Sequence, residues 1–302
     1  MKIIITQWAL DAYLELKRGN VFTEDYYQKQ LRPDALLLSN YPNDPKFDNG
    51  KFWSSAKWNN QLIPNGYKMK WHQVGNGCVQ LRLPIAILNC AYMCQGYVKR
   101  DEKTEKRMLA KFKTHLQLRK AGAVHKMWRI NMNMLAYKDE SSFHLTPEQD
   151  VSLFSISRTM QKAGLPSEFI SAAIRTALRY EGVADLVFLW NSESDANERN
   201  EIIADIQELI DDCSQSEKEE YRYIKLNDLE QVKLHIREFK DGLLKIVNDK
   251  GGISELSKKT NIPQPSLSRF FNSNAMPRRR TLLKIAEALN LDAVRINTSW
   301  AR

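Results

Sequence analysis

Residues 251–289 read GGISELSKKTNIPQPSLSRFFNSNAMPRRRTLLKIAEAL, and the spacing of their apolar positions predicts short helices joined by a tight turn. Residues 253–259 form the first helix of this prediction, 260–262 the turn and 264–271 the second helix, as in a helix-turn-helix. Apolar side chains stand where such an arrangement buries them, at Leu256, Ile262 and Leu267. A following helix carries an apolar stripe at Leu282, Leu283, Ile285, Ala286 and Leu289. Because this stretch belongs to a basic C-terminal segment, DNA is the first partner to consider.

Charge is distributed unevenly along the chain. Residues 1–131 hold 22 Lys and Arg against 10 Asp and Glu, residues 132–230 hold 9 against 20, and residues 231–302 hold 14 against 6. Two basic blocks that flank an acidic one indicate two nucleic-acid-facing modules and a segment that screens or docks one of them. Chance clustering of solvated charges is the plainer alternative.

Length and composition set the class of protein. The 302 residues suffice for two or three domains, and the composition is ordinary for a soluble globular protein. No apolar run approaches the roughly 20 residues of a membrane span, and the apolar stretch at the N-terminus is too short for a secretory signal. Cys78, Cys90, Cys94 and Cys213 lack metal-site spacing, which favours reduced core thiols. We expect a cytoplasmic protein without metal or cofactor.

The first 120 residues change their period along the chain. A short strand over 1–7, an amphipathic helix over 7–18 and a helical region over 23–39, interrupted at Pro33, are predicted first. A long loop follows over 43–65. Alternation with period two then predicts an antiparallel sheet of three strands, over 66–74, 78–83 and 92–99, with a hairpin signal at Gly75-Asn76-Gly77. A basic helix over 101–118 closes this α+β region.

One face of the predicted sheet has the groups that cleave RNA without a metal. Alternation places Lys68, Lys70, His72, Gln80 and Arg82 on that face, and Gln95, Tyr97 and Lys99 join them if the third strand pairs in register. Cleavage needs a base for the 2′-hydroxyl, cations for the phosphate and an acid for the 5′-oxygen. His72 or a lysine of lowered pKa would be the base, Arg82 and Lys70 the cations, and Tyr97 or His72 the acid. A solvent-exposed face that is polar by default is the alternative.

The order of strand, helices and meander, closing on residues 96–103 (GYVKRDEK), resembles the RelE/HigB/ParE toxin superfamily over residues 1–120. The resemblance implies an endoribonuclease fold whose catalytic candidates are Lys70, His72, Arg82, Tyr97 and Lys99. It also implies RNA contacts by Lys68, Gln80, Gln95 and Arg100. Pro84 and the loop over 43–65 depart from compact members of the superfamily. ParE-like relatives poison DNA gyrase, but the basic face with His and Tyr favours the ribonuclease branch.

The C-terminal segment resembles the Xre/lambda-repressor-like helix-turn-helix family through Leu267-Ser268-Arg269, Pro277, Thr281-Leu282, Ala286 and Leu289. The resemblance implies base contacts by Gln264, Ser266 and Arg269, and phosphate contacts by Lys258, Lys259 and Asn272. Further DNA-binding candidates are Ser268 and Arg278-Arg279-Arg280. Pro263 stands where the family has a Ser or Thr cap, and Pro265 follows, but both prolines fit a first helical turn. The three arginines begin a helix, where the helix dipole disfavours cations, so an outside anion would relieve them.

Between these modules the chain is predicted to be mostly helical. Residues 121–145 have no clear period and contain Met132 and Met134, which suggest the start of a once-separate reading frame. A capping signature at Thr146-Pro147-Glu148 opens a helical stretch to residue 213, with breaks at 164–166 and 191–197. The predicted domains are therefore 1–120, a linker 121–145, an acidic helical segment 146–215 and the helix-turn-helix domain 216–302.

Toxin-like and repressor-like modules in this order predict a fused toxin–antitoxin protein. Its partners would be operator DNA, RNA that includes ribosome-bound messenger, and a second copy of the chain, because such repressors bind two half-sites. The acidic segment has a cluster of carboxylates at Glu193, Asp195, Glu198, Glu201, Asp205, Glu208, Asp211 and Asp212. This cluster would cover the basic sheet face, in the same chain or across a dimer. The alternative is an ordinary solvated face of a helix. The competing hypotheses are a regulator with a non-catalytic N-terminal domain and a nucleic-acid scaffold without chemistry.

Overall fold

The computed structural model describes residues 1–75, 79–120, 127–129, 143, 145–214 and 229–291. The chain divides into two compact units. Unit 1 is Met1–Ser142 with Gln215–Ile224, and unit 2 is Phe143–Ser214 with Lys225–Arg302. Residues 146–214 and the described residues 229–291, which were predicted to belong to separate domains, both lie in unit 2. The predicted reading-frame start at Met132 and Met134 lies outside the described residues.

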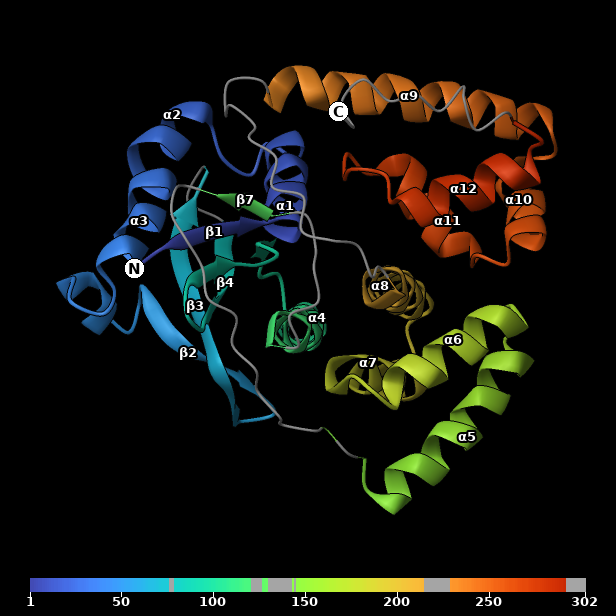
Figure 1. Ribbon diagram of the computed structural model, residues 1–302, viewed down its shortest axis with the longest axis horizontal. Helices are drawn as coiled ribbons and strands as arrows, with labels where there is room; N and C mark the ends of the chain where they lie inside the picture. The colour runs from blue at the N-terminus through green and yellow to red at the C-terminus, as the bar shows by residue number, and fades with distance from the viewer. Residues whose placement is uncertain (76–78, 121–126, 130–142, 144, 215–228, 292–302) are drawn as a thin grey trace. The chain divides into compact units, whose positions relative to one another are not determined.

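Unit 1 begins with a strand, passes through a helical run and then builds most of its sheet (Figure 1). Its first part consists of β1 (Ile3–Thr6), α1 (Gln7–Arg18), α2 (Glu24–Tyr26), the π-helical η1 (Tyr27–Leu31), α3 (Arg32–Leu36) and the 3-10 helices η2 (Leu37–Asn40) and η3 (Pro45–Asp48). Its second part consists of β2 (Trp53–Trp58), β3 (Gln61–Val74), β4 (Val79–Ile87), β5 (Ala91–Met93), β6 (Tyr97–Val98), α4 (Glu102–Lys120) and β7 (Met127–Arg129).

The sheet is mixed, which corrects the prediction of an antiparallel sheet. Its order is β2-β3-β4-β5-β1-β7, with β6 paired to β4. β1 pairs with β5 in parallel, while the β3–β4 and β4–β5 pairs are antiparallel as predicted. Ile3, Ile4 and Ala91 are buried in the parallel pair, and burial of this kind is typical of parallel strands.

Two further strands lie where the sequence predicted none. β2 and the beginning of β3 occupy the predicted loop over 43–65, and Trp53, Ala56 and Trp58 of β2 are buried. β7 lies within the predicted linker over 121–145 and pairs with β1. In both cases backbone hydrogen bonding to a neighbouring strand orders a segment whose own pattern is weak.

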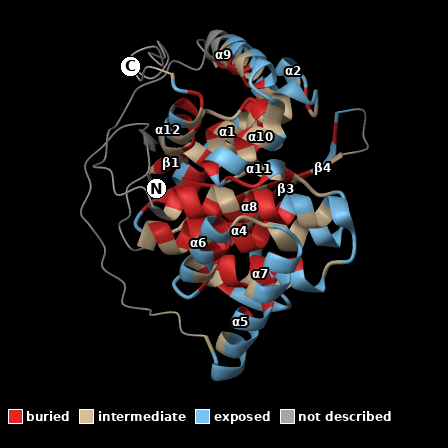
Figure 2. Cartoon of the chain, turned by 90° about the vertical axis from the view of Figure 1, so that its right-hand side faces the viewer, coloured by how far each residue is buried: buried red, intermediate tan, exposed pale blue. Residues whose placement is uncertain are grey.

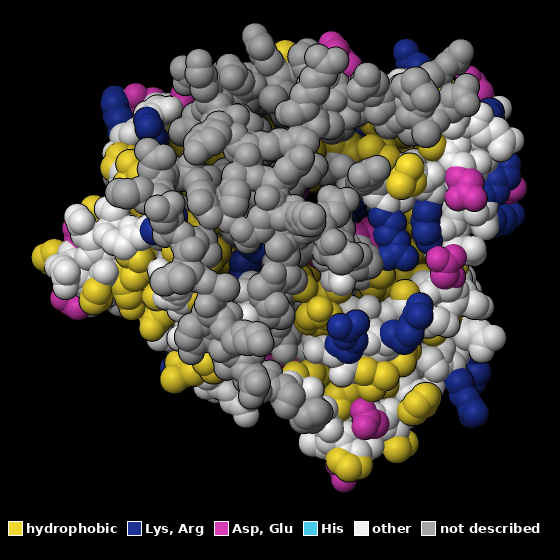
Figure 3. All heavy atoms as spheres, viewed as in Figure 1, with side chains coloured by type: hydrophobic (Ala, Val, Ile, Leu, Met, Phe, Trp, Pro, Cys, Tyr) yellow, Lys and Arg dark blue, Asp and Glu magenta, His cyan; other side chains and the backbone are white. Residues whose placement is uncertain are grey.

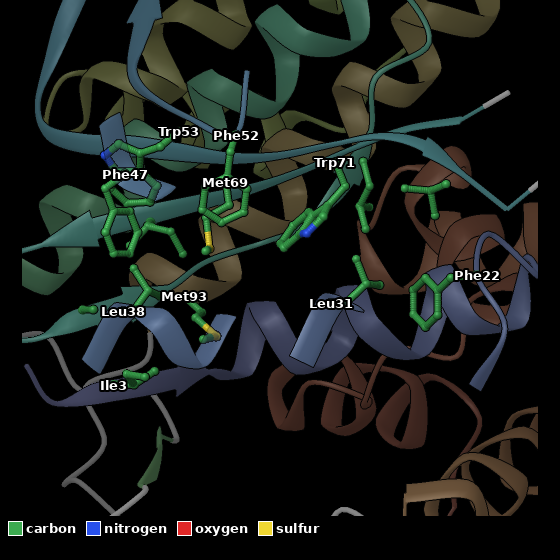
Figure 4. Close-up of a cluster of buried hydrophobic side chains, with 14 residues drawn as sticks. Ile3, Phe22, Leu31, Leu38, Phe47, Phe52, Trp53, Met69, Trp71 and Met93 are labelled. Carbon is green, nitrogen blue, oxygen red and sulfur yellow. The ribbon is translucent and has the colours of Figure 1, made fainter. Parts of the chain in front are cut away.

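The two faces of the sheet in unit 1 pack against different helices. In Figure 4 the side chains of Met69 and Trp71 point from the sheet toward Leu31 and Leu38 of the helical run. All four are buried. The alternation predicted for β3 therefore holds, and the polar residues of this strand lie on the opposite face, where α4 packs against β2 and β4.

The described residues of unit 2 form helices and the turns that connect them. Its helices are α5 (Pro147–Lys162), α6 (Ser167–Ala177), α7 (Glu181–Ser192), α8 (Ala196–Ser214), α9 (Leu229–Asp249), α10 (Gly252–Thr260), α11 (Gln264–Asn272) and α12 (Arg279–Ala288). Thr146 and Gln149 form the capping box predicted at the start of α5. The predicted breaks are present, and a further break separates α6 from α7.

Helix α8 joins the two halves of unit 2. It packs against α6 and α7 and also against α11, and its residues 202–206 and 209–212 are buried (Figure 2). Through this packing the helices that precede α8 and the helix-turn-helix belong to the same compact unit. Among the helices of the described residues, none has the length and apolar character of a membrane span.

Candidate nucleic-acid interfaces

The turn between α10 and α11 is formed by residues whose conformations suit it. Asn261 ends α10 in the left-handed region at φ 54°, which Asn adopts more readily than most residues. The hydroxyl of Ser257 donates to the Ile262 carbonyl at 2.7 Å. Pro263 precedes α11 with φ −55° and Pro265 lies in its first turn. The two prolines therefore begin the helix without a side-chain cap, as the sequence predicted.

The helix-turn-helix has its own apolar core. Leu267 and Phe271 are fully buried on one side of α11, and they cluster with residues of α9, α10 and α12. Arg269 lies about 200° around the helix from Leu267, because each residue advances the helix by about 100°. Arg269 therefore points away from this core, on the side that a recognition helix presents to DNA.

A buried lysine holds the end of α11. Lys240 of α9 is 1% exposed, and its Nζ donates to the Ser273 carbonyl at 2.9 Å and to the Ala275 carbonyl at 2.8 Å. It also lies over the ring of Phe270. The long α9 thus fixes where the recognition helix ends.

Replacing Lys240 by Met is expected to lower the free energy of unfolding of unit 2 by about 1–3 kcal/mol, because it leaves part-buried carbonyls without a donor. Urea denaturation followed by circular dichroism measures the change. Lys245→Met, at an exposed position of the same helix, is the matched control, and its expected change is within about 0.5 kcal/mol. Equal effects of the two substitutions would contradict the assigned role.

The predicted DNA contacts fall into two groups. Lys258, Lys259, Gln264 and Asn272 are exposed, whereas Ser266, Ser268 and Arg280 are partly buried, and the side chain of Arg279 is not described. Arg269 and Arg278 are held by carboxylates of α8. Lys and Arg side chains are spread over unit 2 on the face seen in Figure 3. The helix-turn-helix thus presents two exposed lysines, Lys258 with an ion pair to Glu255 on its own helix, beside two arginines that α8 holds.

Arg269 makes several contacts with α8. Its Nη1 lies 2.7 Å from Asp205 Oδ1, and its Nη2 donates to both the backbone and the carboxylate of Glu201. Asp205 has a side chain only 3% exposed. Burial alone would lower the pKa of Arg269, but Asp205 and Glu208 outweigh it and raise the pKa. Arg269 remains charged and bound.

Arg278 and the N-terminus of α12 are held in the same way. Arg278 Nε lies 2.9 Å from Asp212 Oδ1, and the hydroxyl of Thr281 donates to Asp211 at 3.1 Å. The carboxylates of Asp212 and Glu208 raise the pKa of Arg278 against the opposing effect of burial. For Arg278, the anion predicted at this helix start is therefore supplied by the chain itself.

These ion pairs bear on the acidic cluster that was predicted to cover the basic sheet face. Five of its carboxylates meet the helix-turn-helix: Asp211 through a hydrogen bond, and the others through ion pairs, at Glu201, Asp205, Glu208 and Asp212. The sequence showed that these carboxylates cluster, but it did not show which cations they bind, because either of the two basic blocks could have supplied them.

In unit 1 the strand register brings three of the five predicted catalytic residues into one row. Lys70 of β3 pairs with Arg82 of β4, and Arg82 pairs with Tyr97 of β6. The register that the sequence left conditional for Tyr97 is thus the observed one. Arg82 and Tyr97 are each 5% exposed, and Arg82 also donates to Gln80 Oε1 at 2.7 Å.

Glu105, which the sequence analysis did not single out, connects the row to two more lysines. Its carboxylate accepts from Lys68 at 2.7 Å and also pairs with Lys99. Burial would raise the pKa of Glu105, but these two lysines lower it. Its place in the first turn of α4, soon after Lys99 and Arg100, was the available signal.

The pKa values of Lys70 and Tyr97 move in opposite directions. Burial lowers the pKa of Lys70, with further contributions from Arg82 and Lys68. Burial raises the pKa of Tyr97, and Glu105 adds to the rise. The row thus combines an amine that releases its proton more easily than usual with a phenol that keeps its proton.

The remaining predicted residues of this face lie outside the row. His72 is exposed, with Nε2 3.0 Å from the Lys51 carbonyl, and it falls where the β3–β4 register shifts. Gln95 is partly buried and Arg100 is exposed. Within the residues that the structure describes, no group of His, Cys, Asp and Glu is arranged to hold a metal ion.

The helix-turn-helix geometry agrees with the comparison against known families. Residues 244–296 match the family model described as helix-turn-helix. This segment is a DNA-binding helix-turn-helix of the kind found in transcription regulators. No curated protein and no solved structure matches the chain.

Proposed function

We propose that the chain is a fused toxin–antitoxin protein. Its helix-turn-helix binds operator DNA as part of a homo-oligomer and represses transcription, and unit 1 is an endoribonuclease of the RelE/HigB kind that works without a metal. The row of Lys70, Arg82 and Tyr97 across three strands supports the ribonuclease. An amine of lowered pKa, a guanidinium and a protonated phenol are the three groups that such cleavage needs.

Each group then has a role set by its environment. The neutral amine of Lys70 takes the proton of the 2′-hydroxyl, whose oxygen attacks the phosphorus. Arg82 stabilises the charge that develops on the phosphate. Tyr97 donates its proton to the departing 5′-oxygen, because its raised pKa keeps it protonated. Lys68 and Lys99 release the carboxylate of Glu105 and bind neighbouring phosphates of the RNA instead.

The low exposure of Arg82 and Tyr97 favours a second candidate, a transcription regulator whose unit 1 has no catalytic activity. A phosphate must reach Arg82, and in this state that side chain is buried and paired to Gln80. In this alternative the polar cluster is structural, and Glu105 fixes α4 to the sheet through its two lysines.

Expression of residues 1–142 alone, and separately of the full chain, distinguishes the two candidates. We expect the shorter chain to arrest growth of a bacterium and to generate new 5′ ends in messenger RNA, and the full chain to do neither. The shorter chain contains the whole described core of unit 1. Healthy cells with intact messages would exclude the ribonuclease and leave the regulator. Growth arrest with intact messenger RNA would exclude RNA as the target of the shorter chain and would point to a target such as DNA gyrase.

A further inference from the structure

Helix α8 lies against the outward side of the recognition helix. α11 packs its Leu267 side into the helix-turn-helix core, and α8 packs against α11 where Arg269 points. The hydroxyl oxygen of Ser266, a predicted base contact, is also buried. The surface that would enter a major groove is therefore partly occupied by a helix of the same unit.

The carboxylates of α8 stand where DNA would present its own acceptors. Glu201, Asp205, Glu208 and Asp212 follow one another at spacings of three or four residues, which places them in one stripe along the helix. Arg269 meets the first three and Arg278 meets the last two. A row of negative charge thus runs past both arginines, as a phosphate backbone would.

Carboxylates of α8 also lie at the start of α12. Backbone amides at a helix N-terminus form an anion site, which DNA-binding proteins use for phosphates. Here Asp212 binds Arg278, the residue that precedes α12, and Asp211 accepts from Thr281. Asp211 is 5% exposed, and burial raises its pKa. Two carboxylates of α8 thus bind side chains at the start of α12.

We propose that α8 is an internal mask that competes with DNA for the recognition helix, so that DNA binds only after α8 leaves α11. The proposal rests on the DNA binding stated above. Arg269 cannot donate to a base while Asp205 and Glu201 hold its guanidinium. A phosphate backbone that approached Arg269 would also be repelled by the α8 carboxylates. The helix-turn-helix thus exists in a closed state and an open state.

The exposed cations give the closed state a way to meet DNA. Lys258 and Lys259 are exposed on α10, so they attract the duplex before α8 moves. The measured dissociation constant is then the intrinsic one divided by the fraction of open molecules. Any change that weakens the α8–α11 contact raises that fraction and tightens DNA binding.

The test compares full-length variants that lose the same charge. Asp205→Asn with Asp212→Asn removes two of the carboxylates that hold the arginines, and Glu148→Gln with Asp150→Asn removes two from α5. With a random-sequence duplex pool as the probe, we expect the first variant to bind about tenfold more tightly than wild type or better. The second should change affinity much less.

Hydrogen exchange in the wild-type full chain supplies a measurement that does not depend on the variants folding. Saturating duplex from the same pool should speed exchange across residues 201–212 while α11 stays protected. Unchanged exchange of α8 with DNA bound would overturn the mask, as would equal affinity of wild type and the Asp205/Asp212 variant. Absence of binding by every form, at any salt, would overturn the DNA-binding function and the mask with it.

Discussion

We expect Tyr97→Phe to lower the rate of RNA cleavage by residues 1–142 by about 10²–10⁴-fold, the contribution typical of a general acid. The substitution removes one oxygen and keeps the ring that β6 buries beside Arg82. Without the phenolic proton, the 5′-oxygen must leave as an alkoxide. Single-turnover cleavage of a labelled RNA measures the effect.

Tyr92→Phe is the matched control. Tyr92 is also 5% exposed and lies in β5, but its hydroxyl donates to Asn89 at 3.1 Å and is not part of the row. We expect its cleavage rate to stay within a few-fold of wild type. Equal rates for Tyr97→Phe and wild type would exclude Tyr97 as the acid, and thermal melts of both variants separate loss of chemistry from loss of fold.

The pH profile provides a second readout of the same assignment. If Lys70 is the base, the neutral amine is the active form, so the rate rises with pH toward the lowered pKa of Lys70. Deprotonation of Tyr97 does not cause a matching fall in the usual range, because burial raises its pKa. Lys70→Arg, which cannot lose its proton, should abolish the rise.

The polar face of the sheet could be predicted because period two is a local property of the sequence. Met69 and Trp71 are buried in the core, and Lys70 lies between them on the opposite face, as the alternation indicates. His72 is exposed, as the alternation also indicates, but the β3–β4 pairing is interrupted beside it. The β3–β4 register shifts between Trp71 and Val74, and Gln73 takes a left-handed φ of 61°. A bulge of this kind leaves little trace in a residue pattern.

The rest of the fold depends on contacts between distant segments. β2 escaped prediction because its register shifts between Ser55 and Lys57, which interrupts the alternation. The parallel pairing of β1 with β5 joins residues that are far apart in sequence, and no local pattern indicates it. Likewise, the spacing of the acidic residues on α8 indicates a stripe, but only tertiary packing selects Arg269 as its partner.

The second large effect is expected in the helix-turn-helix core. Phe271→Ala should lower the free energy of unfolding by about 3–5 kcal/mol, because a fully buried aromatic side chain leaves a cavity that the surroundings refill only in part. Phe271 lies in the cluster that joins α9, α10, α11 and α12, with an edge contact to Phe270. Hydrogen exchange of the α11 and α12 peptides measures the loss.

Phe154→Ala makes the same chemical change on α5, where Phe154 is 66% exposed, and it should shift stability by no more than about 0.5 kcal/mol. The pair also tests whether unit 2 unfolds as one body. Because α8 binds α11 through Arg269 and α12 through Arg278, Phe271→Ala should reduce protection in α8 together with α11. Loss of protection in α10–α12 alone would instead mean that the helix-turn-helix unfolds independently of the helices that precede it.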